Sequence, residues 1–258
     1  MRIIRYQLNR ESPQTGWLIE DRVGPITGSI FGEYRRLNAV TPLDKVRLLP
    51  PIIPGKIIGI GRNYAEHASE QGAEVPEIPL LFLKPPSAVI GPADQIKLPP
   101  QSQQVEHEGE LAVVIGKKGR WIAPEDAMQY VFGYTVANDV TARDLQRRDG
   151  QWTRGKGFDT FCPIGPWVET EFDPTDALIT TRVNGEMRQM SSTREMIFNI
   201  PQLIAYITST MTLEPGDLIL TGTPAGVSQL KHGDVVMIDI EGLGTLRNEV
   251  VAEEITRK

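Results

Sequence analysis

The chain has 258 residues, 40% of them hydrophobic, so it can bury one substantial core and is not expected to be disordered. Its 27 basic and 33 acidic residues give a formal charge of -6, with no basic run to follow a nucleic-acid backbone or an anionic membrane. The chain has a lone cysteine, Cys162, and no export signal, which favours a cytoplasmic protein. No apolar stretch approaches the roughly 20 residues that span a bilayer. We therefore expect neither nucleic acid nor a membrane as partner.

The first fifty residues predict a small β domain. The segments MRIIRYQL and TGWLIED are typical of short strands, and turn residues such as Gly24 and Gly28 follow them. The next stretch, LLPPIIPGK, carries three prolines, which neither propagate a helix nor lie centrally in a sheet. We therefore expect a boundary near Ile53, with a β domain over residues 1–53 and the main domain over residues 54–258.

A short helix is predicted after the strand KIIGIGRN, with Asn63 as its cap and Gly72 as its stop. His67 and Glu70 lie three positions apart and share one face of this helix, where a carboxylate can orient an imidazole and stabilise its protonated form. The alternative is a surface helix with an incidental histidine. Among three histidines, His67 ranks first because it has a carboxylate within reach.

The rest of the chain is rich in strand patterns, and Asn184-Gly185 is a strong two-residue hairpin signal. Only APEDAMQYV and NIPQLIAYITSTM are convincing as further helices. A mostly β (α+β) fold follows.

Three carboxylates alternate in VEHEGELAVVIGK. Glu106, Glu108 and Glu110 are spaced by two, and a strand turns every second side chain to the same face. Such a row repels itself unless water solvates it or a cation neutralises it, and hard divalent cations prefer carboxylate oxygens. An acidic edge strand facing water explains the same pattern equally well.

Further polar residues follow the strand FGYTVAND. Asp139 ends it and could meet other acidic groups at the mouth of a β structure, although a lone Asp more often caps a turn. Arg143, Gln146 and Lys156 offer donors suited to a carboxylate substrate, although such side chains are also common on solvated surfaces. Glycines around Lys156 would let the backbone approach a ligand closely.

Seven motifs, in one order along the chain, resemble the fumarylacetoacetate hydrolase family. They run from about residue 54 to the C-terminus: GRNYAEH, FLKPPSAV, EHEGELAVVIGK, NDVTARDLQ, GKGFDTFCPIGP, VNGEMRQ and LEPGDLILTGTPAGV. The resemblance implies a mostly β catalytic domain with a mixed β-barrel or β-roll core, paired into a homodimer, with a small N-terminal β domain in front.

The resemblance also implies a metal site. Glu108, Glu110 and Asp139 fall on the family's metal ligands, with Mg²⁺ or Mn²⁺ as the expected ion and Ca²⁺ as a further option. Glu106 does not match, and we interpret it as surface charge.

Other positions match residues around that metal. His67 and Glu70 resemble the His-Glu pair on a mobile lid helix of the acylpyruvate hydrolase and oxaloacetate decarboxylase branch, and Lys156 joins them as a catalytic candidate. This departure from fumarylacetoacetate hydrolase itself, and the shorter chain, argue against fumarylacetoacetate as the substrate. The resemblance assigns substrate contacts to Arg143, Gln146, Thr160 and Thr223, and more weakly to Lys84, which packing alone could explain.

Together these features predict a divalent-metal-dependent enzyme that acts on a small 2-oxo acid through an enolate stabilised by the metal. The expected reaction is C-C hydrolysis of an acylpyruvate, with His67 as general base. Oxaloacetate-type decarboxylation, and isomerisation of 2-hydroxyhepta-2,4-diene-1,7-dioate-like products of aromatic catabolism, stay open because the same ligands serve all three reactions. A non-catalytic metal-binding protein of the same fold is the remaining alternative.

Overall fold

A computed structural model describes residues 1–9 and 11–254 of the chain. Strands make up 43% of the structure and helices 17%, which confirms the predicted mostly β fold. Among the described residues the larger sheet runs as an open path from β4 to β8 and does not close into a barrel. No helix in these residues is long and apolar enough to cross a membrane.

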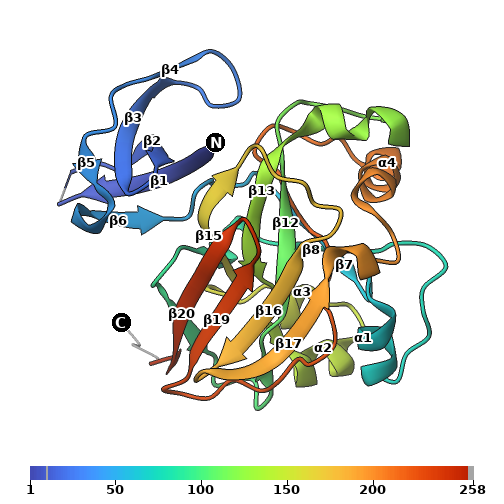
Figure 1. Cartoon of the computed structure of the whole chain (residues 1–258). Helices are drawn as coiled ribbons and strands as arrows, with labels where there is room; N and C mark the ends of the chain where they lie inside the picture. The colour runs from blue at the N-terminus through green and yellow to red at the C-terminus, as the bar shows by residue number, and fades with distance from the viewer. Residues whose placement is uncertain (10, 255–258) are drawn as a thin grey trace.

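The larger sheet has 13 strands and holds both the N-terminal region and the centre of the molecule (Figure 1). Its strands are β1 (Arg2–Leu8), β2 (Gln14–Ile19), β3 (Arg22–Gly28), β4 (Tyr34–Arg36), β5 (Thr41–Pro42), β6 (Val46–Leu49), β7 (Ile57–Gly61), β8 (Leu80–Lys84), β9 (Val89–Ile90), β12 (Gly109–Ile115), β13 (Val131–Asn138), β15 (Cys162–Glu169) and β18 (Leu218–Leu220).

A second sheet of five strands packs against the centre of the first. It consists of β10 (Gln95–Leu98), β16 (Leu178–Val183), β17 (Glu186–Ser192), β19 (Val235–Ile240) and β20 (Gly244–Ala252), and a short pair adds β11 (Val105–Glu106) and β14 (Thr141–Ala142). The predicted hairpin is confirmed, because Asn184 and Gly185 join β16 to β17 with positive φ angles of 52° and 84°.

The helices are few and short. They are α1 (Ala65–Glu70), α2 (Arg143–Asp149), α3 (Thr153–Lys156) and α4 (Ile200–Thr210), with the 3-10 helices η1 (Leu43–Lys45), η2 (Pro86–Ala88), η3 (Pro124–Tyr130) and η4 (Thr193–Glu195). The prediction for NIPQLIAYITSTM is confirmed as α4, which Asn199 and Gln202 start with a capping box. The helix predicted in APEDAMQYV is the 3-10 helix η3.

Asn63 does not cap α1, so that detail of the prediction is wrong. Its buried side chain instead donates to the carbonyls of Phe198 and Thr221 and accepts from the backbone N–H of Phe198. It thereby joins the segment before α1 to two distant segments. The first residue of α1 is preceded by Tyr64, which makes no side-chain cap bond.

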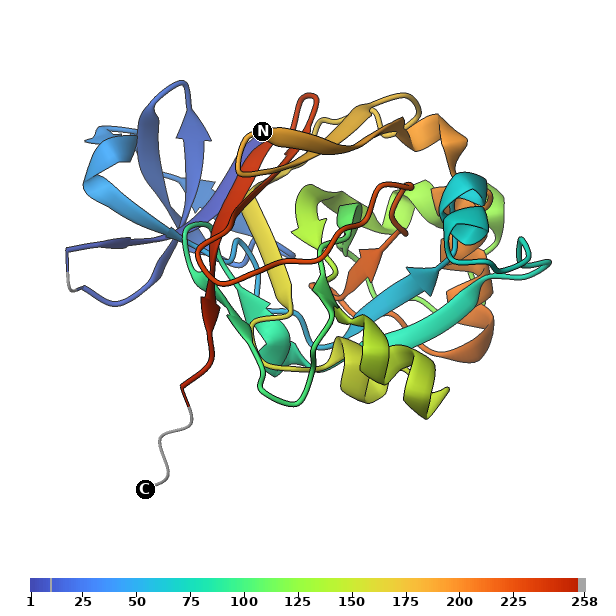
Figure 2. The same ribbon diagram turned by 90° about the horizontal axis from the view of Figure 1, so that it is seen from below.

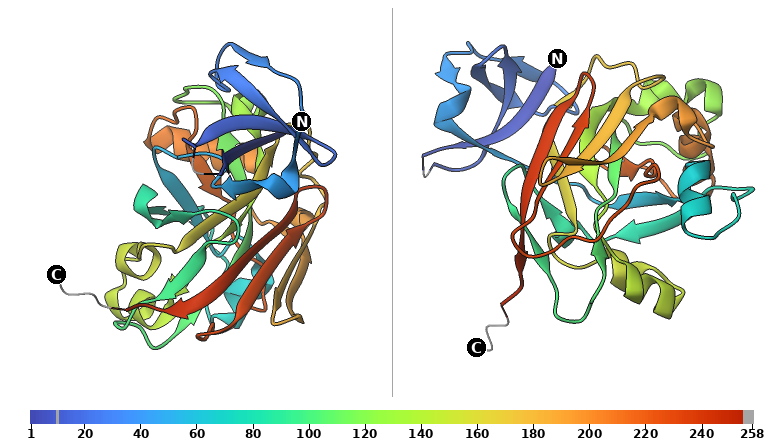
Figure 3. Two further views of the ribbon diagram at one scale, coloured as in Figure 1. Left: turned by 90° about the vertical axis from the view of Figure 1, so that its left-hand side faces the viewer. Right: turned by 60° about the horizontal axis from the view of Figure 1, so that its bottom comes forward.

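The N-terminal strands join the rest of the molecule through sheet pairing. β1 pairs antiparallel with β15, with Arg2 opposite Glu169 and Ile3 opposite Val168. Figure 2 and the right panel of Figure 3 show strands β1–β6, in blue, at one end of the molecule and α1, in cyan, at the other. The proposed domain boundary at residue 53 falls in the segment between β6 and β7.

Candidate active site

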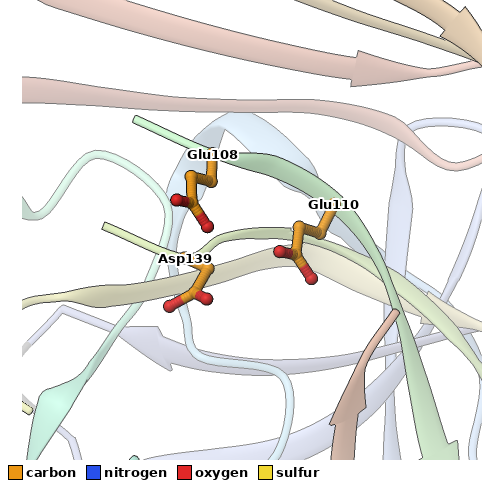
Figure 4. A group of neighbouring side chains, drawn as sticks. All are labelled: Glu108, Glu110 and Asp139. Carbon is orange, nitrogen blue, oxygen red and sulfur yellow. The ribbon is translucent and has the colours of Figure 1, made fainter. Parts of the chain in front are cut away.

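Strand register brings the three predicted metal ligands together. β12 and β13 pair so that Glu110 faces Ala137, and beyond their ends the N–H of Asp139 donates to the carbonyl of Glu108 at 2.9 Å. Figure 4 shows the carboxylates of Glu108, Glu110 and Asp139 turned toward one another. Each offers an oxygen, and these oxygens lie within 4.8 Å of one another. The three residues are at most 4% exposed, so they do not form a solvated edge strand.

Two lysines contact this group. Lys156 Nζ donates to Glu108 Oε2 at 2.7 Å and to Asp139 Oδ2 at 2.5 Å. Lys84 Nζ donates to Asp139 Oδ1 at 2.6 Å and to the carbonyl of Val140 at 3.2 Å. Both ammonium groups are buried, and Asp139 compensates the charge of Lys84, whereas Asp139 and Glu108 together compensate that of Lys156.

Glu106 belongs to the same buried group, so its interpretation as surface charge is wrong. It is 7% exposed, and its Oε2 accepts from Arg143 Nε at 2.7 Å. Arg143 also donates to Glu108 Oε1 at 2.5 Å and to Gln146 Oε1 at 2.7 Å. Arg143 therefore joins two of the alternating carboxylates from one side, a contact that the strand pattern alone does not reveal.

Burial and neighbouring charges act differently on the carboxylates. Burial raises the pKa of Glu108, but the positive charges of Lys156 and Arg143 outweigh it and hold that pKa below its usual range. For Glu110, burial and the negative charges of Asp139 and Glu108 both act upward, so its pKa lies well above the usual value. Lys156 lowers the pKa of Glu110 only in part, and Glu110 is the member of the trio that makes no ion pair with a described residue.

The donor set fits a divalent cation. Four buried carboxylates, those of Glu106, Glu108, Glu110 and Asp139, face the three buried cations Lys84, Arg143 and Lys156. This count leaves one carboxyl group, Glu110, outside the ion pairs, and its Oε2 accepts a hydrogen bond from the N–H of Gly222 at 2.8 Å. A hard cation held by the three converging side chains would favour the ionised form of Glu110, and Mg²⁺ and Mn²⁺ prefer such oxygen ligands.

His67 and Glu70 form a second polar group beside the carboxylates. His67 Nδ1 lies 3.2 Å from Glu70 Oε2, and the other carboxylate oxygen of Glu70 accepts from the N–H of Gly226 at 3.0 Å. If Nδ1 carries the proton for this bond, Nε2 is the basic nitrogen of the ring. His67 is 5% exposed, so it is not the incidental surface histidine of the alternative interpretation.

A cavity of about 280 Å³ is lined by members of both groups, whereas Glu70 and Asp139 lie outside its lining. The predicted site residues that line it are His67, Glu108, Glu110, Arg143, Gln146, Lys156 and Thr223. The hydroxyl of Thr223 donates to the carbonyl of Gly109 at 2.9 Å, so its proton is already committed within the protein.

Two predicted substrate-binding residues lie outside the lining of this cavity. The hydroxyl of Thr160 accepts from the N–H of Lys97 at 2.9 Å, and Lys84 turns its ammonium group to Asp139. Thr160 therefore contacts the segment of β10, and Lys84 acts on the site through a carboxylate rather than from the cavity wall.

The sequence interpretation missed two helices and several lining residues. α2 carries Arg143 and Gln146, and α3 ends at Lys156, so both helices deliver predicted site residues. Arg62, Phe82, Arg147 and Trp152 also line the cavity, with the rings of Phe82 and Trp152 5.4 Å apart. Arg62 lies in the motif GRNYAEH and Phe82 in the motif FLKPPSAV, so these two residues had a signal in the sequence.

A family model described as fumarylacetoacetate hydrolase, C-terminal, matches residues 56–251. The chain belongs to the fumarylacetoacetate hydrolase family. A second model, described as Rv2993c-like, N-terminal, matches residues 1–51. Among relatives in the family, a mitochondrial oxaloacetate tautomerase of Rattus norvegicus is 49% identical over 232 residues, which cover 84% of this chain and 74% of the relative.

Solved structures show the same relationship. A 5-carboxymethyl-2-hydroxymuconate delta-isomerase from Mycobacterium smegmatis is 44% identical, with a TM-score of 0.91 over 98% of this chain and 100% of that one. A maleylpyruvate hydrolase from Sphingobium, in complex with manganese(II) and pyruvate, is 33% identical, with a TM-score of 0.81 over the same shares. The chain is thus similar to enzymes named for tautomerisation, isomerisation and hydrolysis of small acids.

Proposed function

We propose that this chain is a divalent-metal-dependent enzyme that moves a proton next to the keto group of a small 2-oxo diacid, as a tautomerase or isomerase. The observation that carries the proposal is the shared cavity, which His67, oriented by Glu70, lines together with Glu108 and Glu110, whose carboxylates converge with that of Asp139. Mg²⁺ or Mn²⁺ is the proposed ion. We also propose that the protein is a cytoplasmic homodimer, and that a boundary near residue 53 divides the chain into two domains.

The charge and size of the cavity support a small diacid as substrate. Arg62 and Arg147 line it. Arg147 donates to Gln71 at 3.2 Å and Arg62 lies over the ring of Trp152, so neither guanidinium is paired with a carboxylate of the described residues. A volume of about 280 Å³ is at the low end for ligand cavities, which favours a compact substrate.

The chain's own residues supply acid-base chemistry and positioning. When bound, the divalent cation supplies Lewis-acid stabilisation of the charge that develops on the keto oxygen. His67 Nε2 takes the proton from the carbon beside the keto group and returns it to the other end of the enolate. Glu70 orients the ring and offsets the imidazolium charge. Lys156 holds Glu108 and Asp139 in place, while Arg62 and Arg147 bind the substrate's carboxylates.

The sequence identities to the named relatives favour proton transfer over C-C hydrolysis as the first candidate reaction. The relative that is 49% identical is named a tautomerase and the structure that is 44% identical an isomerase, whereas the hydrolase is 33% identical. Hydrolysis of an acylpyruvate stays the second candidate, because that hydrolase is in complex with manganese(II) and pyruvate. In that reaction His67 would instead take a proton from water.

A substrate panel tests the proposal. Purified protein with Mg²⁺ or Mn²⁺ is given enol-oxaloacetate, a hydroxylated dienedioate and an acylpyruvate, and each reaction is followed by ultraviolet absorbance. We expect ketonisation or isomerisation to be fastest, and to be lost with chelator. Faster cleavage of the acylpyruvate would overturn the order of the candidates. Inactivity on the whole panel, with Mn²⁺ bound, would favour a metal-binding protein without this chemistry.

A further inference from the structure

Gln189, in β17, makes four hydrogen bonds with its buried side-chain amide. Its Oε1 accepts from the N–H of Gly109 at 3.0 Å and lies 3.2 Å from His107 Nδ1. Its Nε2 donates to Thr223 Oγ1 and to the carbonyl of Pro224, both at 2.8 Å. Two acceptor positions and two donors are the full capacity of a glutamine amide, so every position is used.

The two halves of this amide bind different parts of the site. Gly109 and His107 flank Glu108, one of the proposed metal ligands, and Gly109 also precedes Glu110. Thr223 and Pro224 lie in the loop that follows β18, which we call the β18 loop (residues 221–228). Gln189 therefore joins the ligand-bearing segment to this loop, although it does not itself line the cavity.

The β18 loop in turn binds two carboxylates of the site. The N–H of Gly222 donates to Glu110 Oε2 at 2.8 Å, and the N–H of Gly226 donates to Glu70 Oε1 at 3.0 Å. The residues that Gln189 binds, Thr223 and Pro224, lie between these two glycines. One loop thus contacts a proposed metal ligand at one end and the partner of His67 at the other.

The β18 loop packs closely against β17. Gly226 has a φ of +100°, and a Cβ placed on it would lie 2.0 Å from the carbonyl oxygen of Arg188. The loop is therefore pressed against the backbone of β17 directly beside Gln189. A shift of the loop away from Gln189 would carry the N–H groups of Gly222 and Gly226 away from their carboxylates.

We propose that Gln189 is a positioning residue that holds the β18 loop in register, so that one amide couples the metal ligand Glu110 to the acid-base pair His67-Glu70. Removing its hydrogen bonds would release the loop and loosen both carboxylates. Loss of such a partner behind a metal ligand commonly costs about 10- to 100-fold in metal affinity or activity. The turnover readout rests on the proposed function, whereas Mn²⁺ affinity and amide exchange do not.

The test compares Gln189→Met with Asn248→Leu. Asn248 is an equally buried amide that donates to the carbonyls of Gly91 and Asp94, away from the cavity. We expect Gln189→Met to bind Mn²⁺ about 10-fold more weakly by calorimetry and to lower kcat about 10- to 100-fold, with a smaller change in KM. Amide exchange in residues 222–228 should accelerate. Asn248→Leu should lose stability without these changes.

A double-mutant cycle tests whether Gln189 acts through Glu70. If it does, Gln189→Met should reduce kcat much less in a Glu70→Gln background than in the wild type. Wild-type Mn²⁺ affinity and loop exchange in Gln189→Met, or equal losses in Asn248→Leu, would overturn the proposal. Should Gln189→Met not fold, Gln189→Glu keeps the acceptors and removes the donors to the loop, and wild-type behaviour of that variant would contradict the proposal equally.

Discussion

The N-terminal strands and the carboxylate site are held together by different interactions. In the N-terminal region, Ile4, Tyr6, Leu18 and Val23 form an apolar cluster, and no charged side chain is buried within residues 1–9 and 11–49. The site instead buries four carboxylates and three cations within one group of contacts. Truncation of an apolar side chain loses its own burial and leaves a cavity, whereas removal of one buried charge leaves its charged partners uncompensated.

Removal of Asp139 should have the largest effect. Asp139→Ala leaves the ammonium groups of Lys84 and Lys156 buried without a shared carboxylate, so we expect a loss of about 3–5 kcal/mol in the free energy of unfolding. Turnover should be lost and Mn²⁺ affinity reduced, as measured by urea unfolding, the substrate panel and calorimetry. Asp21→Ala, at an exposed aspartate of the N-terminal region, is the control. Full activity of Asp139→Ala in chelator would refute the site.

His67→Ala should separate chemistry from metal binding. We expect it to bind Mn²⁺ like the wild type while turnover falls about 10²- to 10⁴-fold, because the variant loses the general base and no metal ligand. His232→Ala, at an exposed histidine whose Nδ1 accepts from the N–H of Ala252, is the matched control. A normal rate for His67→Ala would remove the acid-base role from the mechanism.

Ile4→Ala should lower stability and leave turnover unchanged, in contrast to His67→Ala. Ile4 is fully buried in the N-terminal cluster, so its truncation should cost about 2–5 kcal/mol in the free energy of unfolding. Because this cluster lies away from the cavity, kcat and KM of the folded protein should not change. A fall in kcat without unfolding would show that the two regions are coupled.

The labelling rate of the Cys162 thiol should report the contact between the two regions, and its change is the smallest effect that we predict. Cys162 lies in β15 and packs in one buried cluster with Ile3 of β1, and burial raises its pKa to about 12. The thiolate is the reactive form, so native protein should label very slowly at pH 8, and urea should allow full labelling. Ile3→Ala should increase the native rate. Equal rates in native and unfolded protein would contradict this packing.

Local patterns in the sequence predicted much of the fold. The hairpin at Asn184-Gly185 and helix α4 occur where turn chemistry and capping residues place them. Helices α2 and α3 were missed because they are short and lie in the polar stretch ARDLQRRDGQWTRGKG, which has no clear apolar period. Short helices of this kind form through tertiary contacts rather than through their own propensity.

The sequence by itself determined the alternation of Glu106, Glu108 and Glu110 and the family motifs, because both are properties of neighbouring residues. Tertiary structure decided which carboxylate meets which partner: Lys84 reaches Asp139 across 55 positions, and Arg143 reaches Glu106 across 37. The side-chain period of a strand gives the direction of a carboxylate but not the charge opposite it. The burial of Glu106, and the position of Glu110 outside the ion pairs of the described residues, therefore follow only from the packing of distant segments.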